Sequence, residues 1–156
     1  MTASGKNRPA LLAICGWPAS GKTLLIEQLA ARLLERGLKV LVIKRAAHQL
    51  DLDQDGKDSH RFYQAGADVF AYDKAQSFLH RHGASSLEDV LRDVGAEYDV
   101  VLVEGHKSAA LPKVWLLREG EDEAPEGVSE LRAVLPFGPE RLDALLRIVE
   151  QELAER

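Results

Sequence analysis

The residues from Gly16 to Thr23 have the types and the spacing that phosphate chemistry requires. They match the pattern G-x-x-x-x-G-K-[ST] of a phosphate-binding loop. An apolar run over 11–15 precedes them and an amphipathic segment follows, so a strand, a loop and a helix come in the order that the motif needs. We therefore predict that the whole loop binds the phosphates of a nucleoside triphosphate, with contacts from Gly16, Trp17, Pro18, Ala19, Ser20, Gly21, Lys22 and Thr23.

Separate roles are predicted for the parts of this loop. Gly16 and Gly21 are expected to take positive φ angles and to let the backbone approach phosphate oxygens closely. Lys22 is the expected catalytic cation on the β- and γ-phosphates, and the Thr23 hydroxyl is the expected ligand of a bridging Mg²⁺ ion. The alternative is a chance glycine-rich turn before a helix, which the matching context makes the weaker interpretation.

A second landmark lies at residues 99–105, where four apolar residues are followed by Glu104 and Gly105. An acid at the end of a buried strand is typical of the carboxylate that orients Mg²⁺ beside a phosphate loop. We predict that Glu104 is a catalytic residue and a metal ligand together with Thr23, and that the Gly105 N–H lies near the γ-phosphate. The alternative for Glu104 is an ordinary acid in a loop, a reading that the phosphate loop weakens.

Three further features each allow a functional and a purely structural interpretation. The segment 44–59 is rich in Asp and lacks apolar periodicity, which predicts a switch or substrate loop at a strand's carboxyl end, or else a solvated connector. His80 and His82 would share one face of a strand and could bind a metal, but such a pair is more often a solvated face. Cys15, the only cysteine, is best explained as a small buried hydrophobe.

Strands and helices alternate along the chain. We predict one three-layer α/β/α phosphate-loop nucleoside triphosphatase domain over 1–156, with a mostly parallel sheet and a flexible segment over 1–9. The run 40–43 is expected to be a strand that is buried on both faces, and Asp58 or Ser59 is expected to cap a short helix. The other expected strands are 11–15, 69–72, 99–103, 113–117 and 131–135, with an extended stretch at 77–82, and the expected helices are 22–36, 60–65, 87–94 and 139–154.

Composition limits the possible partners. The chain has 156 residues and a formal charge of −5, which argues against a basic surface for nucleic acid. No apolar run is long enough to span a membrane, and the first residues do not resemble a targeting segment. These features predict a cytoplasmic protein that binds neither nucleic acid nor membrane.

Several blocks in a fixed order resemble the molybdopterin-guanine dinucleotide biosynthesis protein B family. The resemblance covers nearly the whole chain, and it is carried by the phosphate loop, Ile43-Lys44, Gly56-Lys57-Asp58-Ser59-x-Arg61, Ala65-Gly66-Ala67, Val101-Leu102-Val103-Glu104-Gly105-x-Lys107 and Pro112-Lys113. It implies a homodimer that binds GTP and Mg²⁺ with weak GTPase activity. It also implies an adapter role for the molybdenum cofactor guanylyltransferase, which attaches GMP to molybdopterin, and contact with molybdopterin-bearing proteins.

The same resemblance assigns a second group of residues. It places Asp53, Lys57, Asp58 and Arg61 near the nucleotide or on a partner surface. This chain departs from the family in the stretch that follows Lys44, where the family commonly has several histidines and this chain has only His48. An anion contact from that stretch is therefore weakened here or moved to Arg45.

Two other function classes remain open from the residues alone. A small-molecule or nucleotide kinase would need a lid with arginines, and the candidate lid 119–130 is acidic and has none. A metal-insertion GTPase is disfavoured by the single cysteine and the scattered histidines. The usual Asn-Lys-x-Asp guanine reader is absent, and Asp73-Lys74 is only superficially similar to it, so GTP is implied by the resemblance alone.

Overall fold

The computed structural model describes residues 8–46, 53, 55–83 and 85–156. Most of the segment 1–9, which was expected to be flexible, lies outside these residues, as does His48. The chain divides into two compact units, one formed by Met1–Arg45 with Val90–Arg156 and the other by Ala46–Asp89. The expectation of a single domain stays a prediction, because two compact units of one chain are not by themselves two independently folding domains.

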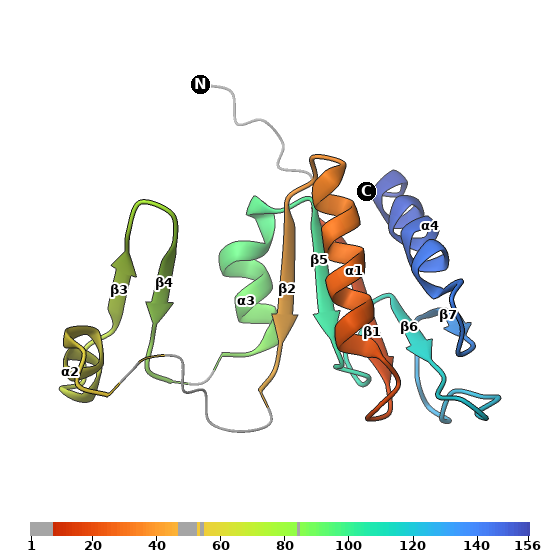
Figure 1. The fold of residues 1–156 in the computed structure, drawn as a ribbon, viewed down its shortest axis with the longest axis horizontal. Helices are drawn as coiled ribbons and strands as arrows, with labels where there is room; N and C mark the ends of the chain where they lie inside the picture. Colours follow the sequence, from red (N-terminus) through yellow and green to blue (C-terminus); the bar gives the residue numbers. More distant parts are fainter. Residues whose placement is uncertain (1–7, 47–52, 54, 84) are drawn as a thin grey trace. The chain divides into compact units, whose positions relative to one another are not determined.

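A five-stranded sheet with the order β2-β5-β1-β6-β7 forms the centre of the larger unit, and every neighbouring pair in it is parallel (Figure 1). Each strand is a short apolar run, as expected for a sheet whose middle strands are buried on both faces. The parallel α/β architecture predicted from the sequence is therefore confirmed. The strands are β1 Ala10–Gly16, β2 Val40–Lys44, β5 Val100–Glu104, β6 Lys113–Leu116 and β7 Leu131–Leu135.

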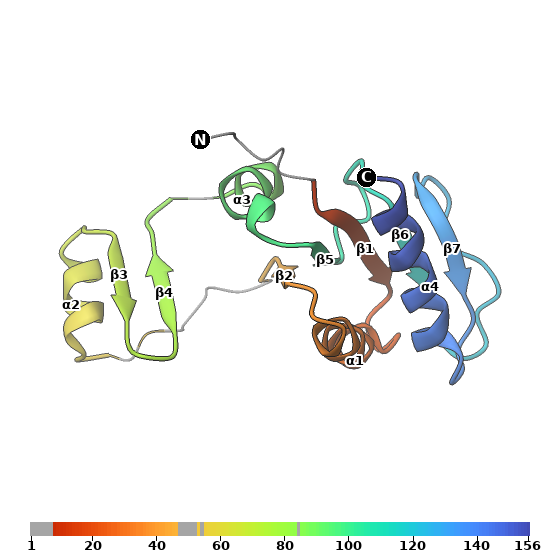
Figure 2. The same ribbon diagram turned by 90° about the horizontal axis from the view of Figure 1, so that it is seen from above.

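Helices α1 (Lys22–Glu35) and α4 (Arg141–Ala154) cover one face of this sheet (Figure 2). The second half of α3 (Leu87–Val94), which belongs to the larger unit, lies on the other face and leads through the short helix η1 (Gly95–Glu97) into β5. Alternate strand residues fill the core beneath α1 and α4. They include Leu12, Ile14, Val100, Leu102, Val114 and Leu116.

A lysine is buried on the opposite face of the sheet. Lys113 begins β6, is 0% exposed, and donates from Nζ to the carbonyl oxygens of Ala109 (2.7 Å), Leu111 (3.0 Å) and Ser129 (2.9 Å). These carbonyls lie in the two connections on either side of β6. The ammonium therefore fixes both connections to the sheet, which gives the Pro112-Lys113 block a structural explanation.

The connections of the sheet create one switch point. After β1 the chain crosses to β2 on one side, whereas after β6 it moves to β7 on the other, so a crevice is expected between the carboxyl ends of β1 and β6. Ligands of open α/β sheets bind in such crevices. The loop 16–22 leaves β1 at this point.

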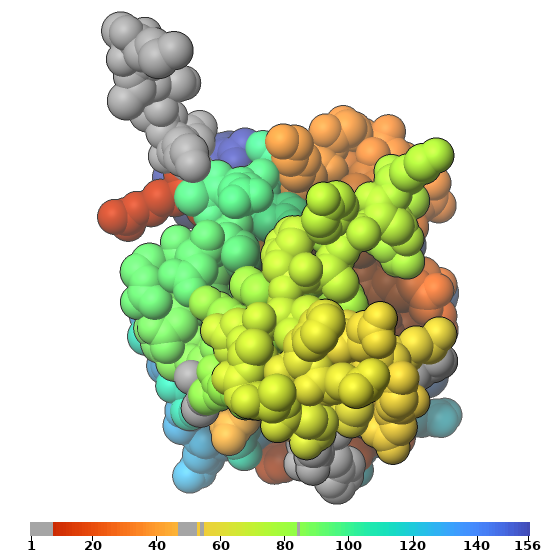
Figure 3. Space-filling view, turned by 90° about the vertical axis from the view of Figure 1, so that its left-hand side faces the viewer, coloured from red at the N-terminus to blue at the C-terminus, as the bar shows by residue number. Residues whose placement is uncertain are grey.

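The smaller unit consists of α2 (Asp58–Gln64) and a hairpin of β3 (Val69–Tyr72) and β4 (Ser77–His80). Figure 3 shows these elements as yellow to lime atoms in space-filling form. Among the described residues of this unit, only Leu87 is a buried hydrophobic residue. Large apolar side chains are instead exposed, namely Phe62, Phe70, Tyr72, Phe78 and Leu79.

Two expectations for individual elements were wrong. β2 is an edge strand, and its Val42 is 43% exposed, so the strand is not buried on both faces. The N-cap of α2 is Lys57, without a side-chain hydrogen bond, so neither Asp58 nor Ser59 caps it. The pair His80 and His82, for which metal binding was the weaker interpretation, stacks both rings on Tyr63, with centroid distances of 3.5 and 3.8 Å.

Replacing the buried lysine should destabilise the larger unit. In Lys113→Met the aliphatic stem remains, but the carbonyls of Ala109, Leu111 and Ser129 lose their donor. We expect the free energy of unfolding, measured by urea denaturation, to fall by about 2–4 kcal/mol. Lys39→Met, at an exposed position before β2, is the matched control. An equal, small change in both variants would contradict a structural role for Lys113.

Candidate phosphate-binding site

The chain turns sharply between the end of β1 at Gly16 and the start of α1 at Lys22. A Cβ on Gly16 would lie 2.5 Å from Ser20 Oγ and 2.9 Å from the carbonyl oxygen of Leu116, so only glycine fits there. Positive φ angles occur instead at Ala19 (64°) and Gly21 (88°). The predicted positive φ is thus confirmed for Gly21 and wrong for Gly16, whose constraint is close packing.

The ammonium of Lys22 lies across this turn. Its Nζ donates to the carbonyl oxygens of Gly16 (2.8 Å) and Trp17 (3.0 Å). The N-terminus of α1 has no side-chain cap and no acidic residue in its first turn, so its N–H groups and dipole are not neutralised by a local carboxylate. Ser20 Oγ is buried without a hydrogen-bond partner in the structure. This combination of donors suits an anion.

Trp17 connects the loop to the segment after β5. Its ring packs on Trp115 in a T-shaped arrangement at a centroid distance of 5.5 Å, and Lys107 Nζ lies 5.0 Å from the centroid of the Trp17 ring. Cys15 donates its thiol hydrogen to the carbonyl of Gly105 (3.1 Å), and burial raises the pKa of that thiol. The sequence motif included Trp17, but it gave no sign that Lys107 and Trp115 would be its neighbours.

Glu104 ends β5 beside the strand that carries the loop. It is in register with Ile14 of β1 and with Lys44 of β2, and its carboxylate, 17% exposed, lies 3.7 Å from Lys44 Nζ. The Gly105 N–H donates to the carbonyl of Ile14 (2.9 Å). This bond engages the N–H that we predicted to lie near the γ-phosphate, and its contact with phosphate stays a prediction.

The donor set near the loop fits Mg²⁺ better than a transition metal. Mg²⁺ is commonly held by one or two carboxylates plus the phosphates of a substrate, and Glu104 and the Thr23 hydroxyl are oxygen donors of that kind. Within the residues that the structure describes, no group of three or more His, Cys, Asp or Glu side chains could hold a metal ion on its own. Thr23 is exposed in the first turn of α1.

The polar block predicted from the resemblance lies in the smaller unit. Asp53 Oδ1 accepts a hydrogen bond from Ser59 Oγ (3.0 Å), while Lys57, Asp58 and Arg61 are exposed on α2 or at its start. The loop 16–23 belongs to the larger unit. The structure therefore assembles the loop without these four residues, and their contact with a nucleotide stays a prediction.

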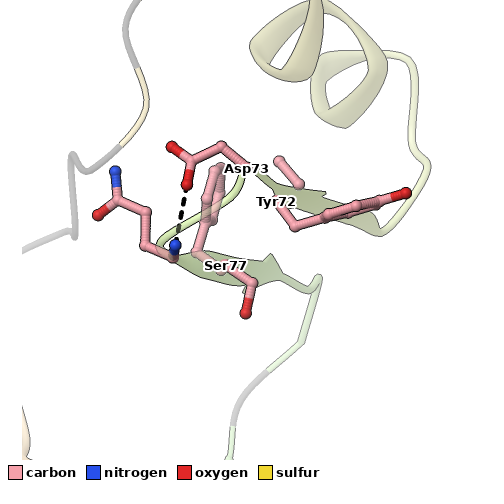
Figure 4. A pocket seen from close by; sticks show the side chains of 6 residues that line it. Tyr72, Asp73 and Ser77 are labelled. Atoms are coloured by element: carbon pink, nitrogen blue, oxygen red, sulfur yellow. Dashed lines mark hydrogen bonds between the residues drawn. The ribbon is translucent and has the colours of Figure 1, made fainter.

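Asp73 is occupied by its own turn. Its Oδ1 accepts from the N–H groups of Ala75 (2.7 Å) and Gln76 (2.9 Å), and the second of these bonds is drawn in Figure 4. These backbone hydrogen bonds hold the pKa of the Asp73 carboxyl below its usual range. Asp73, Tyr72 and Ser77 line a small pocket at the end of the hairpin. The carboxylate of Asp73 thus closes the turn between β3 and β4.

Arg141 was missed by our sequence reading. It begins α4, is only 6% exposed, and donates to the carbonyls of Ser20 (2.8 Å), Pro136 (2.8 Å), Leu117 and Leu135. Burial lowers the pKa of the guanidinium, and within the described residues no ion pair to it is found. The sequence did contain a signal that Arg141 is buried. Arg141 stands four residues before Leu145 and so falls on the apolar stripe of the helix.

A family model described as molybdopterin guanine dinucleotide synthesis protein B matches residues 11–136. The molybdopterin-guanine dinucleotide biosynthesis adapter protein of Escherichia coli is 32% identical over 96% of this chain and 91% of its own length. The Haemophilus influenzae protein of the same name is 36% identical over 72% of this chain and 66% of its own.

Solved structures agree with these sequence relatives. The crystal structure of a MobB protein homolog from Bacillus stearothermophilus superposes with a TM-score of 0.70 at 25% identity, covering 94% of this chain and 99% of the other. Among the described residues, no helix is long and apolar enough to cross a membrane. From the family model, the relatives and the shared fold, the chain belongs to the MobB family of molybdopterin guanine dinucleotide synthesis proteins.

Proposed function

We propose that this chain binds GTP with Mg²⁺ and acts as an adapter in the biosynthesis of molybdopterin guanine dinucleotide. Its partner is a molybdenum cofactor guanylyltransferase, which attaches GMP to molybdopterin. The observation that carries the nucleotide-binding part is the turn 16–22, with Lys22 Nζ lying across it. The adapter part is supported by the names of the relatives from E. coli and H. influenzae.

The loop is suited to a polyphosphate because its donors are already held in place. Lys22 bonds to two carbonyls that offer only partial negative charge, and phosphate oxygens are stronger acceptors for an ammonium. Gly21 directs the backbone into α1, whose first-turn N–H groups point toward the same region. Exchange of the carbonyls for phosphate therefore needs little rearrangement of the loop.

Slow hydrolysis is expected. Fast phosphoryl transfer to water needs a residue that orients the water and a cation that stabilises the developing charge. Glu104 lies beside Lys44, and the ammonium of Lys107 lies over the Trp17 ring. The segment 105–112 contains no arginine. The acidic stretch 119–130 has none either, which also weakens the kinase alternative.

The exposed apolar side chains of the smaller unit support a homodimer. Phe70 and Tyr72 are 61% and 79% exposed on the same strand, with ring centroids 6.2 Å apart. Monomeric soluble proteins seldom leave such side chains grouped in water. A second copy of the chain is the occupant that the family resemblance implies.

Removal of the loop ammonium should abolish tight nucleotide binding. For Lys22→Ala we expect the GTP affinity, measured by calorimetric titration with Mg²⁺, to fall by about 10- to 100-fold, the loss of charge-assisted hydrogen bonds to phosphate. Lys39→Ala is the matched control. Lys39 is exposed and precedes β2, so it lies at the amino ends of the parallel strands, whereas the loop leaves their carboxyl ends. ATP and GDP are titrated alongside GTP.

Each result of that titration has a clear meaning. Selective GTP binding that is lost in Lys22→Ala and kept in Lys39→Ala supports the proposal and leads to a binding assay with the guanylyltransferase. Retained affinity in Lys22→Ala contradicts it. Selective ATP binding would favour the kinase alternative, which requires ADP production that depends on an added acceptor.

The metal role of Glu104 predicts a change that appears only with Mg²⁺. Glu104→Gln keeps the shape of the side chain but removes the charge, so we expect the Mg²⁺-dependent gain in GTP affinity to fall by about tenfold. Affinity in EDTA should not change, and the stability should not change because Lys44 is 62% exposed. Glu126→Gln, in the exposed acidic stretch, is the control. Equal Mg²⁺ dependence in all three proteins would exclude this role.

The dimer proposal predicts a change of mass in solution. The double variant Phe70→Ser and Tyr72→Ser removes exposed rings whose loss costs a monomer little, so it should stay folded and sediment as a monomer where the wild type sediments as a dimer. Leu34→Ser, 57% exposed on α1 of the larger unit, is the control. A monomeric wild type, or a double variant that still dimerises, would refute this placement of the interface.

A further inference from the structure

An exposed aromatic ring stands at the carboxyl end of β7. Phe137 is 58% exposed and lies in the connection between β7 and α4. The guanidinium carbon of Arg141 lies 5.1 Å from its ring centroid. One side of the ring is thus supported by a buried cation, while much of the rest is open to solvent.

The same arginine connects this ring to the phosphate loop. Arg141 donates to the carbonyl of Ser20 inside the loop, to Leu117 after β6 and to Pro136 next to the ring. Its guanidinium also lies 3.7 Å from the position of a Cβ on Gly21. Only one guanidinium therefore separates the ring of Phe137 from the end of the loop that enters α1.

A nucleotide bound at the loop can extend along the sheet edge in two directions. Toward β5 it meets Glu104, whose carboxylate and neighbouring Lys44 ammonium suit a metal ion and charged phosphate oxygens. Toward β6 and β7 it meets the crevice at the switch point and then Phe137. The aromatic surroundings toward β6 and β7 suit the flat base of the nucleotide.

Trp17 is the competing aromatic platform, and its surroundings disfavour it. Its ring already carries the Lys107 ammonium and packs on Trp115, and it is 36% exposed, against 58% for Phe137. A base on Trp17 would have to displace a cation. A base on Phe137 would complete a stack in which the other member is Arg141.

We propose that Phe137 is the stacking platform for the purine base of the bound nucleotide, and that Arg141 positions both this ring and the loop residue Ser20. The inference rests on the proposed nucleotide binding and adds its base subsite. Stacking on an aromatic ring tolerates either purine. Phe137 is therefore assigned to affinity for the base and not to the choice between guanine and adenine.

The test separates base from phosphate by using two ligands. GTP and inorganic tripolyphosphate are titrated calorimetrically with Mg²⁺ into the wild type and Phe137→Ala. Loss of the platform should lower the GTP affinity by about 5- to 100-fold and leave the tripolyphosphate affinity within about twofold. Phe137→Trp should restore the GTP affinity. Phe62→Ala removes an equally exposed ring, also 58%, from the smaller unit and serves as the control.

Arg141→Lys provides a second readout for positioning. This variant should lower the affinity for both GTP and tripolyphosphate, because the Ser20 carbonyl loses a donor and the Phe137 ring loses the guanidinium beneath it. The exposed position of Phe137 means that Phe137→Ala should unfold at the same urea concentration as the wild type.

Unchanged GTP affinity in Phe137→Ala overturns the inference while leaving the proposed function intact. An equal loss for GTP and tripolyphosphate in Phe137→Ala also overturns it, because the ring would then act on the loop and not on the base. A wild type that binds neither ligand refutes the proposed function, and the base subsite with it.

Discussion

The turn between β1 and α1 is the constraint on which the rest of the larger unit depends. β1 is the central strand of the sheet, and the chain must reverse its direction within the few residues after it. The reversal leaves Gly16 so close to Ser20 and to the carbonyl of Leu116 at the end of β6 that no Cβ fits at position 16. The tight turn leads directly into the uncapped N-terminus of α1, whose free N–H groups suit an anion.

Two buried cations hold the connections around this turn and around β6 in place. Lys113 and Arg141 are both satisfied by carbonyl oxygens and not by carboxylates. A carbonyl stabilises a cation through its dipole but does not cancel its charge. Each of these side chains therefore fastens connections to the sheet and leaves a net positive charge inside the unit. Lys113 does so on the face away from α1 and α4, and Arg141 does so directly behind the loop.

Local sequence signals predicted the elements well. β7 covers 131–135 and α3 covers 87–94, as expected, the latter because Ser86 and Asp89 exchange hydrogen bonds within one turn. Such signals depend on neighbours in the chain. The position of a strand in the sheet depends on distant segments of the chain. The apolar run 40–43 was therefore predicted to be a buried strand, although it forms the edge strand β2.

The parts of the site that the sequence did not predict depend on distant partners. The close packing at Gly16 involves Leu116 of β6 as well as Ser20, and Arg141 is bonded to carbonyls of the loop and of the segments around β6 and β7. The carbonyl partners of Arg141 have no local signature, because a carbonyl acceptor is present at every position. The loop itself was predictable because its motif specifies backbone geometry within eight consecutive residues.

The uncompensated charge of Arg141 has an energetic consequence for ligand binding. Burial disfavours the charged form, which is why its pKa is lowered, yet arginine remains protonated in proteins. The folded chain without a ligand therefore carries a desolvation cost that an anion near Ser20 would offset by Coulomb attraction at low effective dielectric. An anion bound only by the folded state stabilises that state. If phosphate binds at the loop as we propose, the buried arginine would couple the stability of the loop to that binding without having to touch the phosphate itself.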